Sequence, residues 1–424
     1  MTTSGPMSAA ERTRLMIYAG VLLTLVQFAV PYEGLIGLPV LFFLKNRLHL
    51  SAHGVATFNL IASIPLFVGF AFGFLRDTWS PFGRGDRAHL VVFGLATAAS
   101  YAVMVAFQPT YAVLLLGVLA GTTTIQMVSS AGRGASAAIG QEEAVTGQAS
   151  VAGNLAYAIP GLVAYFAGGA LSGYLESRDA VAASRTLFAV GGGLMVIVAL
   201  MGAFGPKRLF DHHHAQAREH TMAADFVRLF RHKPLYPIMA IQLLWQFSPA
   251  VGAVLPFHLA NDLHASDAQV GAWYGIFFGS FVPVYVVYTW LCRRVRLNAL
   301  LWIGTALAVV QMTPMLIAGT PDQALVAACA MGLIGGLGQA AYTDLAIRAC
   351  PQGLQGSMIM MFIAMYYVSL RFGDVLGAYL FDQKGGYHTA LYASMAVYAL
   401  ILPVLLLVPR RLTATYEGEA VATA

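Results

Sequence analysis

Long apolar stretches recur along this chain, and they limit its possible folds more than any other feature. A helix of ~20 apolar residues crosses the ~30 Å hydrocarbon core of a bilayer and satisfies its own backbone hydrogen bonds there. Only 10% of the 424 residues are charged and 58% are hydrophobic, whereas soluble domains usually contain ~25% charged residues. The sequence therefore predicts an all-α integral membrane protein with twelve transmembrane helices. The predicted spans are Leu15 to Leu44, Ala52 to Leu75, His89 to Phe107, Thr110 to Gly132, Val145 to Leu171, Ala182 to Phe204, Pro237 to Ala260, Ala268 to Leu291, Leu297 to Ala318, Asp322 to Ile347, Gln355 to Leu380 and Tyr387 to Val408.

Lysine and arginine are distributed unevenly between the predicted loops. With the amino terminus in the cytoplasm, eighteen of the 24 basic residues lie on the cytoplasmic side, as the positive-inside rule requires. We expect both termini to be cytoplasmic and the protein to lie in the inner (plasma) membrane of a bacterium, surrounded by its lipids. The net charge of +5 follows from this orientation and does not indicate a nucleic-acid partner. One basic residue, Arg371, falls within a span, and the outer side carries Lys45, Arg47, Arg178, Arg185 and Lys384.

The two halves of the chain share short motifs. "NRLHLS" at 46–51 follows the first predicted span and "NDLHAS" at 261–266 follows the seventh, a shift of 215 residues. A duplicated unit of six spans explains this repetition. The same shift relates Gly117, Gly121 and Arg133 to Gly332, Gly336 and Arg348. The predicted organisation is a cytoplasmic tail at 1–14, a six-helix bundle at 15–204, a cytoplasmic linker at 205–236, a second six-helix bundle at 237–409 and a cytoplasmic tail at 410–424.

The linker contains three consecutive histidines, His212 to His214. Histidines bind metal ions, but no cysteine or acidic cluster completes a site here, and a solvated linker accounts for them. The chain also lacks the "GxxxxGK[ST]" motif of ATP-driven pumps, and no nucleophile with a neighbouring base stands out. We expect neither an enzyme nor a metal site nor a bound cofactor.

Two six-span halves joined by a cytoplasmic linker resemble the parallel-repeat transporters of the major facilitator type, which hold their substrate near the bilayer midplane. The stretch "GFAFGFLRDTWSPFGRGDRAHL" at 69–90 is similar to the charged signature of that superfamily between spans 2 and 3. We expect Asp77 to face the amino end of the eleventh span and the arginines to bridge the two halves as a conformational latch. Simple anchoring of the loop at the membrane surface is the alternative. The matching residues are Gly73, Asp77, Gly83, Arg84 and Arg87.

Four segments resemble hallmark segments of the folate-biopterin transporter family. They are "LFFLKNRLHLSAHGVATFNLIASIP", "GFLRDTWSPFGRGDRAHL", "LPFHLANDLHASDAQVG" and "RACPQGLQGSMIMMFIAMYYVSLRFGDVLGAYL". The resemblance implies transport of a pterin or folate. Three positions depart from the family pattern: Gly69 stands where a lysine is typical, Arg76 where a serine is typical, and Gln355 where an acid is typical. A pterin- or folate-like compound or another carboxylate is therefore the expected substrate.

Glu33 lies within the first span, in "QFAVPYEGLIGLP" at 27–39, where prolines and glycines weaken the helix. A charge inside a membrane is costly unless it is paired or hydrated, and it therefore indicates function. The major facilitator resemblance implies that spans 1, 4, 7 and 10 line the cavity. Because burial favours a neutral carboxyl group and a nearby arginine favours a charged one, Glu33 is a candidate for proton coupling. A structural carboxylate, held by broken backbone or by Arg371, is the alternative.

Arg371 and Asp374 lie three residues apart in the eleventh span and share a helix face. Their charges could pair only to stabilise the helix. If Asp374 or Glu33 releases Arg371 in one state, however, the guanidinium is the best candidate for binding a carboxylate or phosphate. Asp374 is therefore a second candidate for proton coupling, and Arg371 is the candidate anion site.

Further candidates are a cytoplasmic gate and a cavity wall. Asp344 and Arg348 are four residues apart, in the order that favours pairing on a helix, and a merely structural role is as compatible with the sequence as a gate. The gate candidates are Arg133, Glu142, Asp344 and Arg348. Amides beside aromatic rings suit a flat heterocyclic ligand, with packing as the alternative. The wall candidates are Gln27, Gln126, Tyr157, Trp245, Gln246, His258 and Tyr274.

Together these features predict a monomeric secondary transporter that moves a small organic anion by alternating access, coupled to protons. The alternative is an exporter of lipophilic cations by proton antiport, in which Glu33 binds the cation and Arg371 is its counter-ion. A non-transporting receptor or assembly factor is a third class, which the bent first span and the charged loop disfavour.

Overall fold

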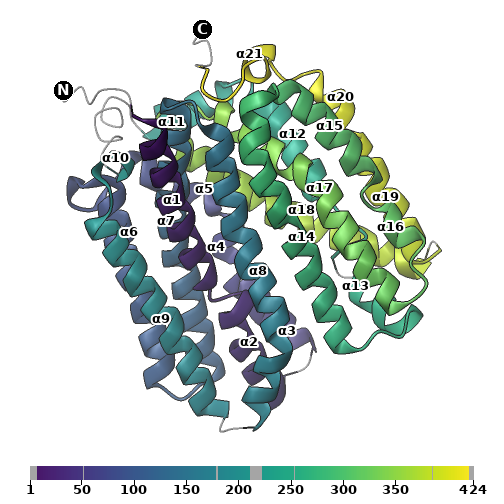
Figure 1. The fold of residues 1–424 in the computed structure, drawn as a ribbon. Coiled ribbons are helices and arrows are strands. Elements are labelled where there is room, and N and C mark those ends of the chain that lie inside the picture. Colours follow the sequence, from purple (N-terminus) through teal and green to yellow (C-terminus); the bar gives the residue numbers. More distant parts are fainter. Residues whose placement is uncertain are drawn as a thin grey trace.

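The computed structural model describes residues 7–50, 52–177, 180–210, 222–252, 254–383 and 385–419. Within these residues the chain is helical and contains no strand. The helices form two bundles that lie side by side, one from each half of the chain (Figure 1). The histidines His212 to His214 lie outside the described residues.

The first bundle runs from α1 to α9, and two short helices, α10 (Lys207–Phe210) and α11 (Met222–Arg231), follow it. In this bundle α6 packs along both α7 and α9. Its elements are α1 (Ala9–Phe28), α2 (Gly34–Phe42), η1 (Phe43–Arg47), α3 (Ala52–Ala62), α4 (Ile64–Phe67), α5 (Gly69–Thr78), η2 (Pro81–Gly83), α6 (Gly85–Ala106), α7 (Tyr111–Glu142), α8 (Thr146–Ser177) and α9 (Ala180–Phe204).

The second bundle runs from α12 to α20, and a short helix, α21 (Arg410–Thr413), follows it. In this bundle α17 packs along both α14 and α15. Its elements are α12 (Leu235–Gln246), α13 (Val254–Phe257), η4 (His258–Asp262), α14 (Asp267–Arg294), α15 (Leu297–Val310), α16 (Thr313–Leu316), α17 (Pro321–Ala349), α18 (Gln355–Gln383), α19 (Tyr387–Ala399) and α20 (Ile401–Leu405).

Nine helices of the described chain are long and apolar enough to cross a membrane. They correspond to nine of the twelve predicted spans, and two of them combine a long and a short helix, α15 with α16 and α19 with α20. The first, second and seventh predicted spans are divided into shorter helices. Proline explains two of these breaks, because it lacks an amide hydrogen and clashes with the preceding turn. Pro31 lies between α1 and α2, and Pro249 lies between α12 and α13. The weakened first span is therefore confirmed, whereas the seventh span is not continuous as we expected.

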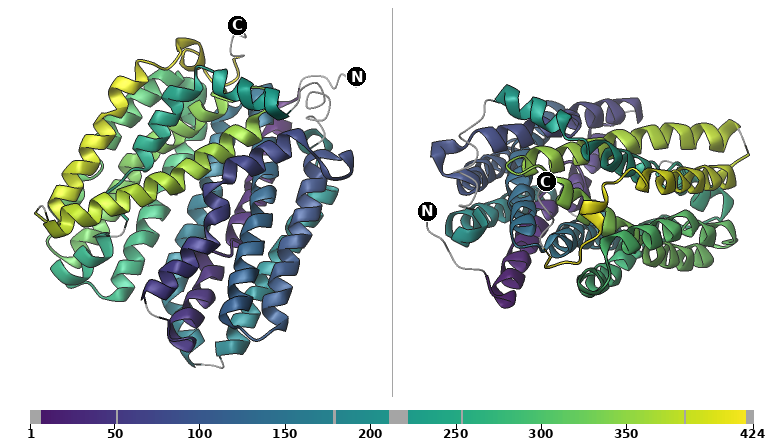
Figure 2. Two further views of the ribbon diagram at one scale, coloured as in Figure 1. Left: turned by 180° about the vertical axis from the view of Figure 1, so that it is seen from behind. Right: turned by 90° about the horizontal axis from the view of Figure 1, so that it is seen from above.

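Both ends of the described chain lie at the same end of the two bundles, which we call the termini end (Figure 1). The turn between α7 and α8 and the turn between α17 and α18 lie there as well; α2, α3 and α13 lie toward the opposite, far end (Figure 1). α5 packs against α18 near the termini end, and the helices of the second span diverge from α18 toward the far end (Figure 2). Buried hydrophobic side chains form two clusters, one almost entirely within each bundle. Each bundle therefore has its own core.

Candidate functional site

The break between α1 and α2 places a carboxylate in the interior of the first bundle. Gly34 begins α2 with a φ of 65°, a conformation that favours glycine. Pro31 packs against α7, where a Cβ added at Gly121 would lie 3.3 Å from its Cγ. Glu33 lies in this break, and its Oε1 accepts a 3.0 Å hydrogen bond from Nε2 of Gln27. Gln27 is therefore the direct partner of Glu33.

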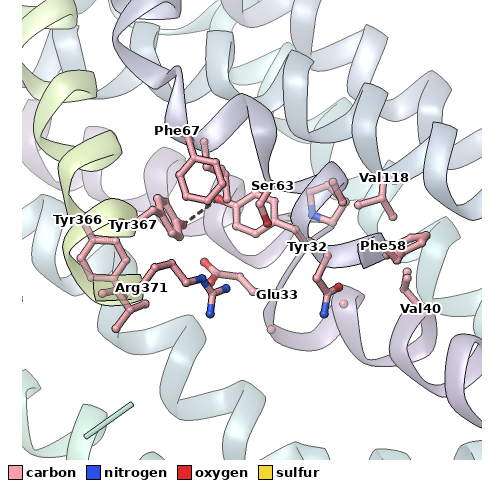
Figure 3. A pocket seen from close by; sticks show the side chains of 17 residues that line it. Tyr32, Glu33, Val40, Phe58, Ser63, Phe67, Val118, Tyr366, Tyr367 and Arg371 are labelled. Atoms are coloured by element: carbon pink, nitrogen blue, oxygen red, sulfur yellow. Dashed lines mark hydrogen bonds between the residues drawn. The ribbon is translucent and has the colours of Figure 1, made fainter. Parts of the chain in front are cut away.

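A pocket of about 330 Å³ lies beside Glu33 (Figure 3). Its walls come from both bundles: the break, α2, α3 and α4 on one side, and α18 on the other. Glu33 and Arg371 reach the pocket from opposite bundles (Figure 3). The polar lining includes Tyr32, Glu33, Asn59, Ser63, Tyr366, Tyr367 and Arg371.

Arg371 keeps an accessible guanidinium. Its Nη1 lies 3.4 Å from Oδ2 of Asp374, one turn further along α18, yet the Arg371 side chain is 62% exposed. In the part of the chain that the structure describes, no ion pair joins Arg371 to Glu33. The pair expected within the eleventh span is present, and Arg371 can still bind a second anion.

Two pairs of tyrosines connect the bundles next to the pocket. The hydroxyl oxygens of Tyr32 and Tyr367 are 3.2 Å apart, and those of Tyr157 and Tyr366 are 3.0 Å apart. Both pairs have an edge-to-face arrangement of their rings. Tyr157 and Tyr366 each lie eleven residues beyond the start of their helices, which is roughly 16 Å from the termini end at 1.5 Å per residue. The tyrosine pairs therefore lie near the middle of a ~30 Å hydrocarbon core.

Arg133 lies beside these tyrosines and not in the predicted gate. It interacts electrostatically with Tyr32, Tyr157 and Tyr367. A Cβ added at Gly153 of α8 would lie 4.0 Å from Nη1 of Arg133, so the guanidinium extends from α7 toward α8. The expectation was wrong for a geometric reason: α7 continues for nine residues beyond Arg133, whereas α17 ends one residue after Arg348. The two repeat counterparts therefore lie at different depths.

Two wall candidates lie away from this pocket. Trp245 is buried in the core of the second bundle, where its ring packs against Tyr342 and Tyr398. His258 belongs to η4; its Nδ1 lies 2.7 Å from Oδ2 of Asp262, and its ring stacks on Tyr387 with centroids 3.9 Å apart. Both were expected in the cavity wall, but both side chains pack against aromatic rings of the second bundle instead.

The other wall candidates divide in the same way. Tyr157 bonds to the pocket residue Tyr366, as Gln27 does to Glu33. Tyr274 stacks on Tyr165 at 5.1 Å and donates a 3.1 Å hydrogen bond to the carbonyl of Val251. The remaining two do not line the pocket around Glu33: Gln126 is buried in α7, and Gln246 ends α12.

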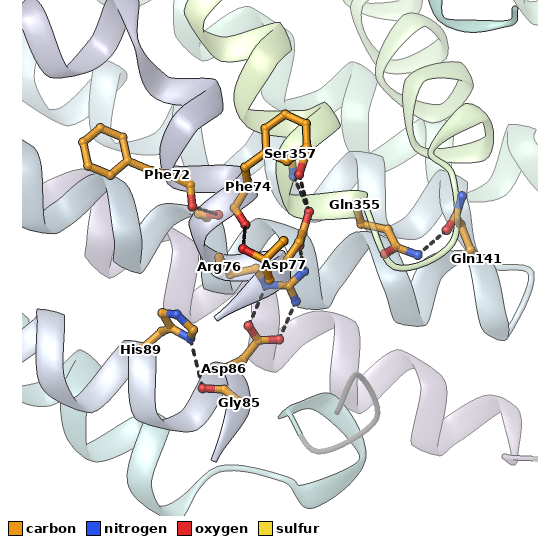
Figure 4. A network of polar contacts seen from close by, with 12 residues as sticks. Phe72, Phe74, Arg76, Asp77, Gly85, Asp86, His89, Gln141, Gln355 and Ser357 are labelled. Carbon is orange, nitrogen blue, oxygen red and sulfur yellow. Dashed lines mark hydrogen bonds and ion pairs between the residues drawn. The ribbon is translucent and has the colours of Figure 1, made fainter. Parts of the chain in front are cut away.

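Asp77 connects the two bundles at the termini end (Figure 4). Its Oδ2 accepts hydrogen bonds from the backbone nitrogen and the Oγ of Ser357, at 2.7 and 2.6 Å. Ser357 lies in the first turn of α18, where the helix dipole favours a carboxylate. This is the contact that the sequence led us to expect for Asp77.

The arginine that binds Asp77 is its neighbour Arg76, which stands where the folate-biopterin pattern has a serine. Its Nη1 lies 2.6 Å from Oδ1 of Asp77, and its Nε lies 2.7 Å from Oδ1 of Asp86 (Figure 4). The side chains of Arg76, Asp77 and Asp86 are at most 3% exposed. Burial of two acids against one arginine makes this ionic cluster the most enclosed charged group of the loop.

The contacts that the described residues show for Arg84 and Arg87 do not include the expected bridge between the bundles. Arg87 donates hydrogen bonds to the carbonyls of Gly202 and Gly205, at 3.2 and 2.8 Å, at the carboxyl end of α9. This contact lies within the first bundle, because the face of α6 that carries Arg87 packs along α9. Arg84 is exposed and takes part in no ion pair within the described residues.

A second group of polar contacts joins the bundles around α17. Nε of Arg348 lies 2.9 Å from Oδ1 of Asp344 and 3.1 Å from Oγ1 of Thr146 in α8. Asp344 also accepts a 3.0 Å hydrogen bond from the hydroxyl of Tyr288. Asp344 and Arg348 therefore lie at a contact between the bundles at the termini end, and their role as a gate stays a prediction.

The last turn of α7 reaches the same place. Nε2 of Gln141 donates to the carbonyls of Ile347 and Cys350, at 2.8 and 2.7 Å. Nε2 of Gln355 in turn donates to Oε1 of Gln141 at 2.8 Å (Figure 4). Glu142 is exposed at the end of α7, next to these contacts.

The segment after α21 crosses between the bundles, and we call residues 414–419 the strap. The backbone nitrogen of Gly418 donates to the carbonyl of Ala144 at 2.7 Å, and that of Glu417 donates to the carbonyl of Cys292 at 3.0 Å. Ala144 belongs to the first bundle and Cys292 to the second. The Glu417 carboxylate also accepts a hydrogen bond from Sγ of Cys292, and burial raises the pKa of Glu417.

Cys292 is only 1% exposed to solvent in the intact protein. Removing the strap is expected to expose it. In a chain that carries Cys329→Ser and Cys350→Ser, truncation after Thr413 should raise the rate of maleimide labelling of Cys292 at least about tenfold, which corresponds to ~1.4 kcal/mol of lost protection. The rate is measured by mass spectrometry at one pH. Truncation after Glu419 is the matched control and should leave the rate unchanged. Equal rates for both truncations would show that other residues shield the thiol.

Two helical bundles that enclose a polar pocket at the membrane midplane are the architecture of a membrane transporter. A model of the Major Facilitator Superfamily matches residues 23–373 and 248–421. The chain belongs to this superfamily and is a membrane transporter. The match is to the superfamily as a whole, so the narrower resemblance to folate-biopterin transporters stays a proposal. No curated protein sequence matches the chain.

Several solved structures share this fold. The major facilitator transporter FucP in the outward conformation aligns with a TM-score of 0.68, covering 93% of this chain and 99% of that chain at 15% identity. A variant of the E. coli fucose:proton symporter FucP aligns with a TM-score of 0.64, covering 92% and 97% at 15% identity. A bacterial homologue of the iron transporter ferroportin, in an outward-facing state, aligns with a TM-score of 0.64, covering 93% and 98% at 15% identity. At this identity the likeness establishes the fold alone.

Proposed function

We propose that this protein moves a small organic anion, a pterin- or folate-like compound or another carboxylate, together with protons by alternating access. The observation that carries the proposal is the pocket that Glu33 and Arg371 share at the break in the first span. One wall offers a carboxyl group that can hold a proton. The opposite wall offers a guanidinium, which binds carboxylates through two parallel hydrogen bonds.

Charge balance supports coupling between proton and anion. Glu33 and Asp374 carry the negative charges near the pocket, and Arg371 and Arg133 carry the positive ones. When Glu33 binds a proton, one negative charge is lost, and an anion that enters with the proton restores it. Because unbalanced charge inside a membrane is costly, each ligand favours the binding of the other. Linkage requires the two effects on affinity to be equal.

The contacts between the bundles support alternating access. Hydrogen bonds that Ser357 donates to Asp77 and Arg348 donates to Thr146 close the termini end, whereas α2 and α3 line the pocket on the side of the far end. With both termini in the cytoplasm, this arrangement is the state of the transport cycle that faces outward. Both walls of the pocket come from one chain, so the proposed transporter works as a monomer in the lipid bilayer.

Replacing Glu33 with glutamine tests the coupling. The side chain keeps its size and its contact with Gln27 but can no longer carry a proton, so we expect proton-driven uptake to fall at least about tenfold. Substrate exchange without net proton movement should persist. Uptake is measured in pyranine-loaded liposomes under an imposed pH gradient, acidic outside, with pterin-6-carboxylate, folate, benzoate and succinate as anions and with ethidium and tetraphenylphosphonium as cations.

Glu11→Gln is the matched control, because Glu11 is exposed and pairs with Arg208 away from the pocket. It should transport like the unmodified protein. Equal gradient-driven uptake by Glu33→Gln and Glu11→Gln would refute the coupling. Proton exchange with the two cations alone would instead support the exporter of lipophilic cations and refute the anion proposal.

A further inference from the structure

Arg133 has no acidic partner among the described residues, unlike Arg76, Arg348 and Arg371. Arg76 binds Asp77 at 2.6 Å, Arg348 binds Asp344 at 2.9 Å, and Arg371 lies 3.4 Å from Asp374. Arg133 makes no hydrogen bond or ion pair with any described residue. A guanidinium within the membrane is costly unless it is paired or hydrated. Because no described residue pairs with Arg133, its guanidinium is open to an anion that takes the place of water.

The surroundings of Arg133 are aromatic and rich in hydroxyl groups. Tyr32, Tyr157 and Tyr367 lie within electrostatic range of its guanidinium. Each of these tyrosines belongs to one of the two pairs that connect the bundles. A phenol that leaves its pair can donate a hydrogen bond to an anion, and its ring can pack on a flat ligand.

Tyr32 and Tyr367 connect the pocket with the surroundings of Arg133, because both line the pocket and both interact electrostatically with the guanidinium. Tyr32, Tyr366 and Tyr367 line the pocket, whereas Arg133 and Tyr157 do not. Each pair joins a residue of the first bundle to a residue of α18 in the second. A relative movement of the bundles therefore opens both pairs, and the opening connects the pocket to Arg133.

Two guanidinium groups then follow each other along the pore. Arg371 lies sixteen residues beyond the start of α18, and Arg133 lies nine residues before the end of α7. At 1.5 Å per residue these positions are roughly 24 and 14 Å from the termini end. The two guanidinium groups are therefore roughly 10 Å apart in depth. Tyr157 and Tyr366, roughly 16 Å from the termini end, lie between Arg371, the outer cation, and Arg133, the inner one.

We propose that Arg133 is an inner binding site for the carboxylate group of a planar aromatic acid, which reaches it from the pocket when the tyrosine pairs open. The inference rests on the proposed function and names the class of its substrate. The guanidinium holds the carboxylate through two hydrogen bonds, the released phenols donate to its remaining lone pairs, and the tyrosine rings flank the ring of the ligand. No covalent step takes place.

Binding to the full-length protein in detergent micelles tests this site. Dissociation constants are measured by equilibrium dialysis for benzoate and pterin-6-carboxylate, with benzamide as the neutral analogue of benzoate. We expect Arg133→Gln to raise the dissociation constants of both acids at least about tenfold and to leave that of benzamide unchanged. Arg133→Lys should give a smaller increase, because an ammonium group lacks the fork of a guanidinium. Arg84→Gln, at an exposed arginine, is the matched control and should bind all three probes normally.

The outcomes distinguish the inner site from the proposed function. Unchanged acid binding by Arg133→Gln, while Glu33→Gln still loses proton-driven uptake, overturns the inner site and leaves the proposed function standing. Proton-driven uptake of succinate by a protein that binds neither aromatic acid overturns the aromatic class of substrate. If no anion is taken up with protons, both proposals fail. If Arg133→Gln does not elute as a single folded species, Arg133→Lys decides, and unchanged affinity for both acids in that variant overturns the site.

Discussion

Replacing Arg76 with alanine is expected to lower the free energy of unfolding by about 3–5 kcal/mol, because it leaves buried charges without a partner. The guanidinium lies within 2.7 Å of carboxylate oxygens of both Asp77 and Asp86, and all three side chains are almost fully enclosed. Without it, two carboxylates remain in the interior with no cation. The free energy is measured by unfolding in mixed micelles with increasing dodecyl sulfate, followed by circular dichroism.

Two variants bracket this result. Arg84→Ala removes an exposed arginine from the same loop and should change the free energy of unfolding by less than about 0.5 kcal/mol. Arg76→Lys should fall between the two, because a single ammonium group cannot hold both carboxylates in the geometry of the guanidinium. If Arg76→Ala is as stable as Arg84→Ala, the cluster does not hold the loop together.

Replacing Gly73 with alanine is expected to open the termini end. A Cβ at this position would lie 2.5 Å from the carbonyl oxygen of Gly356 and 2.6 Å from Cα of Ser357. These are backbone atoms that cannot rotate away, so α5 and α18 must separate, and the hydrogen bonds between Asp77 and Ser357 one turn further along are lost. Overpacking of this kind costs about 1–3 kcal/mol, which favours the open state by a factor of roughly 5 to 150.

Labelling of Cys350 measures that opening. Cys350 is 5% exposed at the end of α17, and its carbonyl accepts a hydrogen bond from Gln141 of the first bundle. In a chain that carries Cys292→Ser and Cys329→Ser, Gly73→Ala should raise the rate at which maleimide labels Cys350 by a factor of roughly 5 to 150. Gly193→Ala is the matched control, because a Cβ at Gly193 meets no atom within 4 Å. Equal rates in the two variants would contradict the expected opening of the termini end.

The sequence predicted the long helices well because apolar length alone decides them. The seventh span was misjudged, although "QFSPAVGA" at 246–253 contains a proline and a glycine. In the first span the same residue types surround Glu33, and the charge drew attention to the break. Without a charge, mean hydropathy over ~20 residues does not reveal a local loss of backbone hydrogen bonds.

The candidate site was predicted in part. Glu33 and Arg371 line one pocket because each is a charge within an apolar run, which the sequence displays directly. Arg133 was placed in the gate because its repeat counterpart Arg348 is there. The repeated motifs do not show where each helix ends, and α7 continues further beyond Arg133 than α17 does beyond Arg348.

The tyrosines of α18 were missed, although a signal for them was present. In "MYYVSLR" at 365–371, Tyr367 precedes Arg371 by four residues and so shares its helix face. The contact between Tyr157 and Tyr366 joins residues 209 positions apart, and no local pattern in the sequence predicts such a contact.

The ionic groups at the termini end are each complete within one bundle. Arg76, Asp77 and Asp86 belong to the first bundle, and Asp344 and Arg348 belong to the second. From these ionic groups, the contacts that cross between the bundles are a carboxylate that accepts from Ser357 and an arginine that donates to the hydroxyl of Thr146; the contacts of Gln141, Gln355 and the strap add neutral hydrogen bonds. Separation of the bundles therefore breaks hydrogen bonds that water can replace. Arg76, Asp77 and Asp86 keep one another as partners in the first bundle, as Asp344 and Arg348 do in the second. A closure built in this way holds firmly, yet it can open and close in every cycle at little cost in free energy.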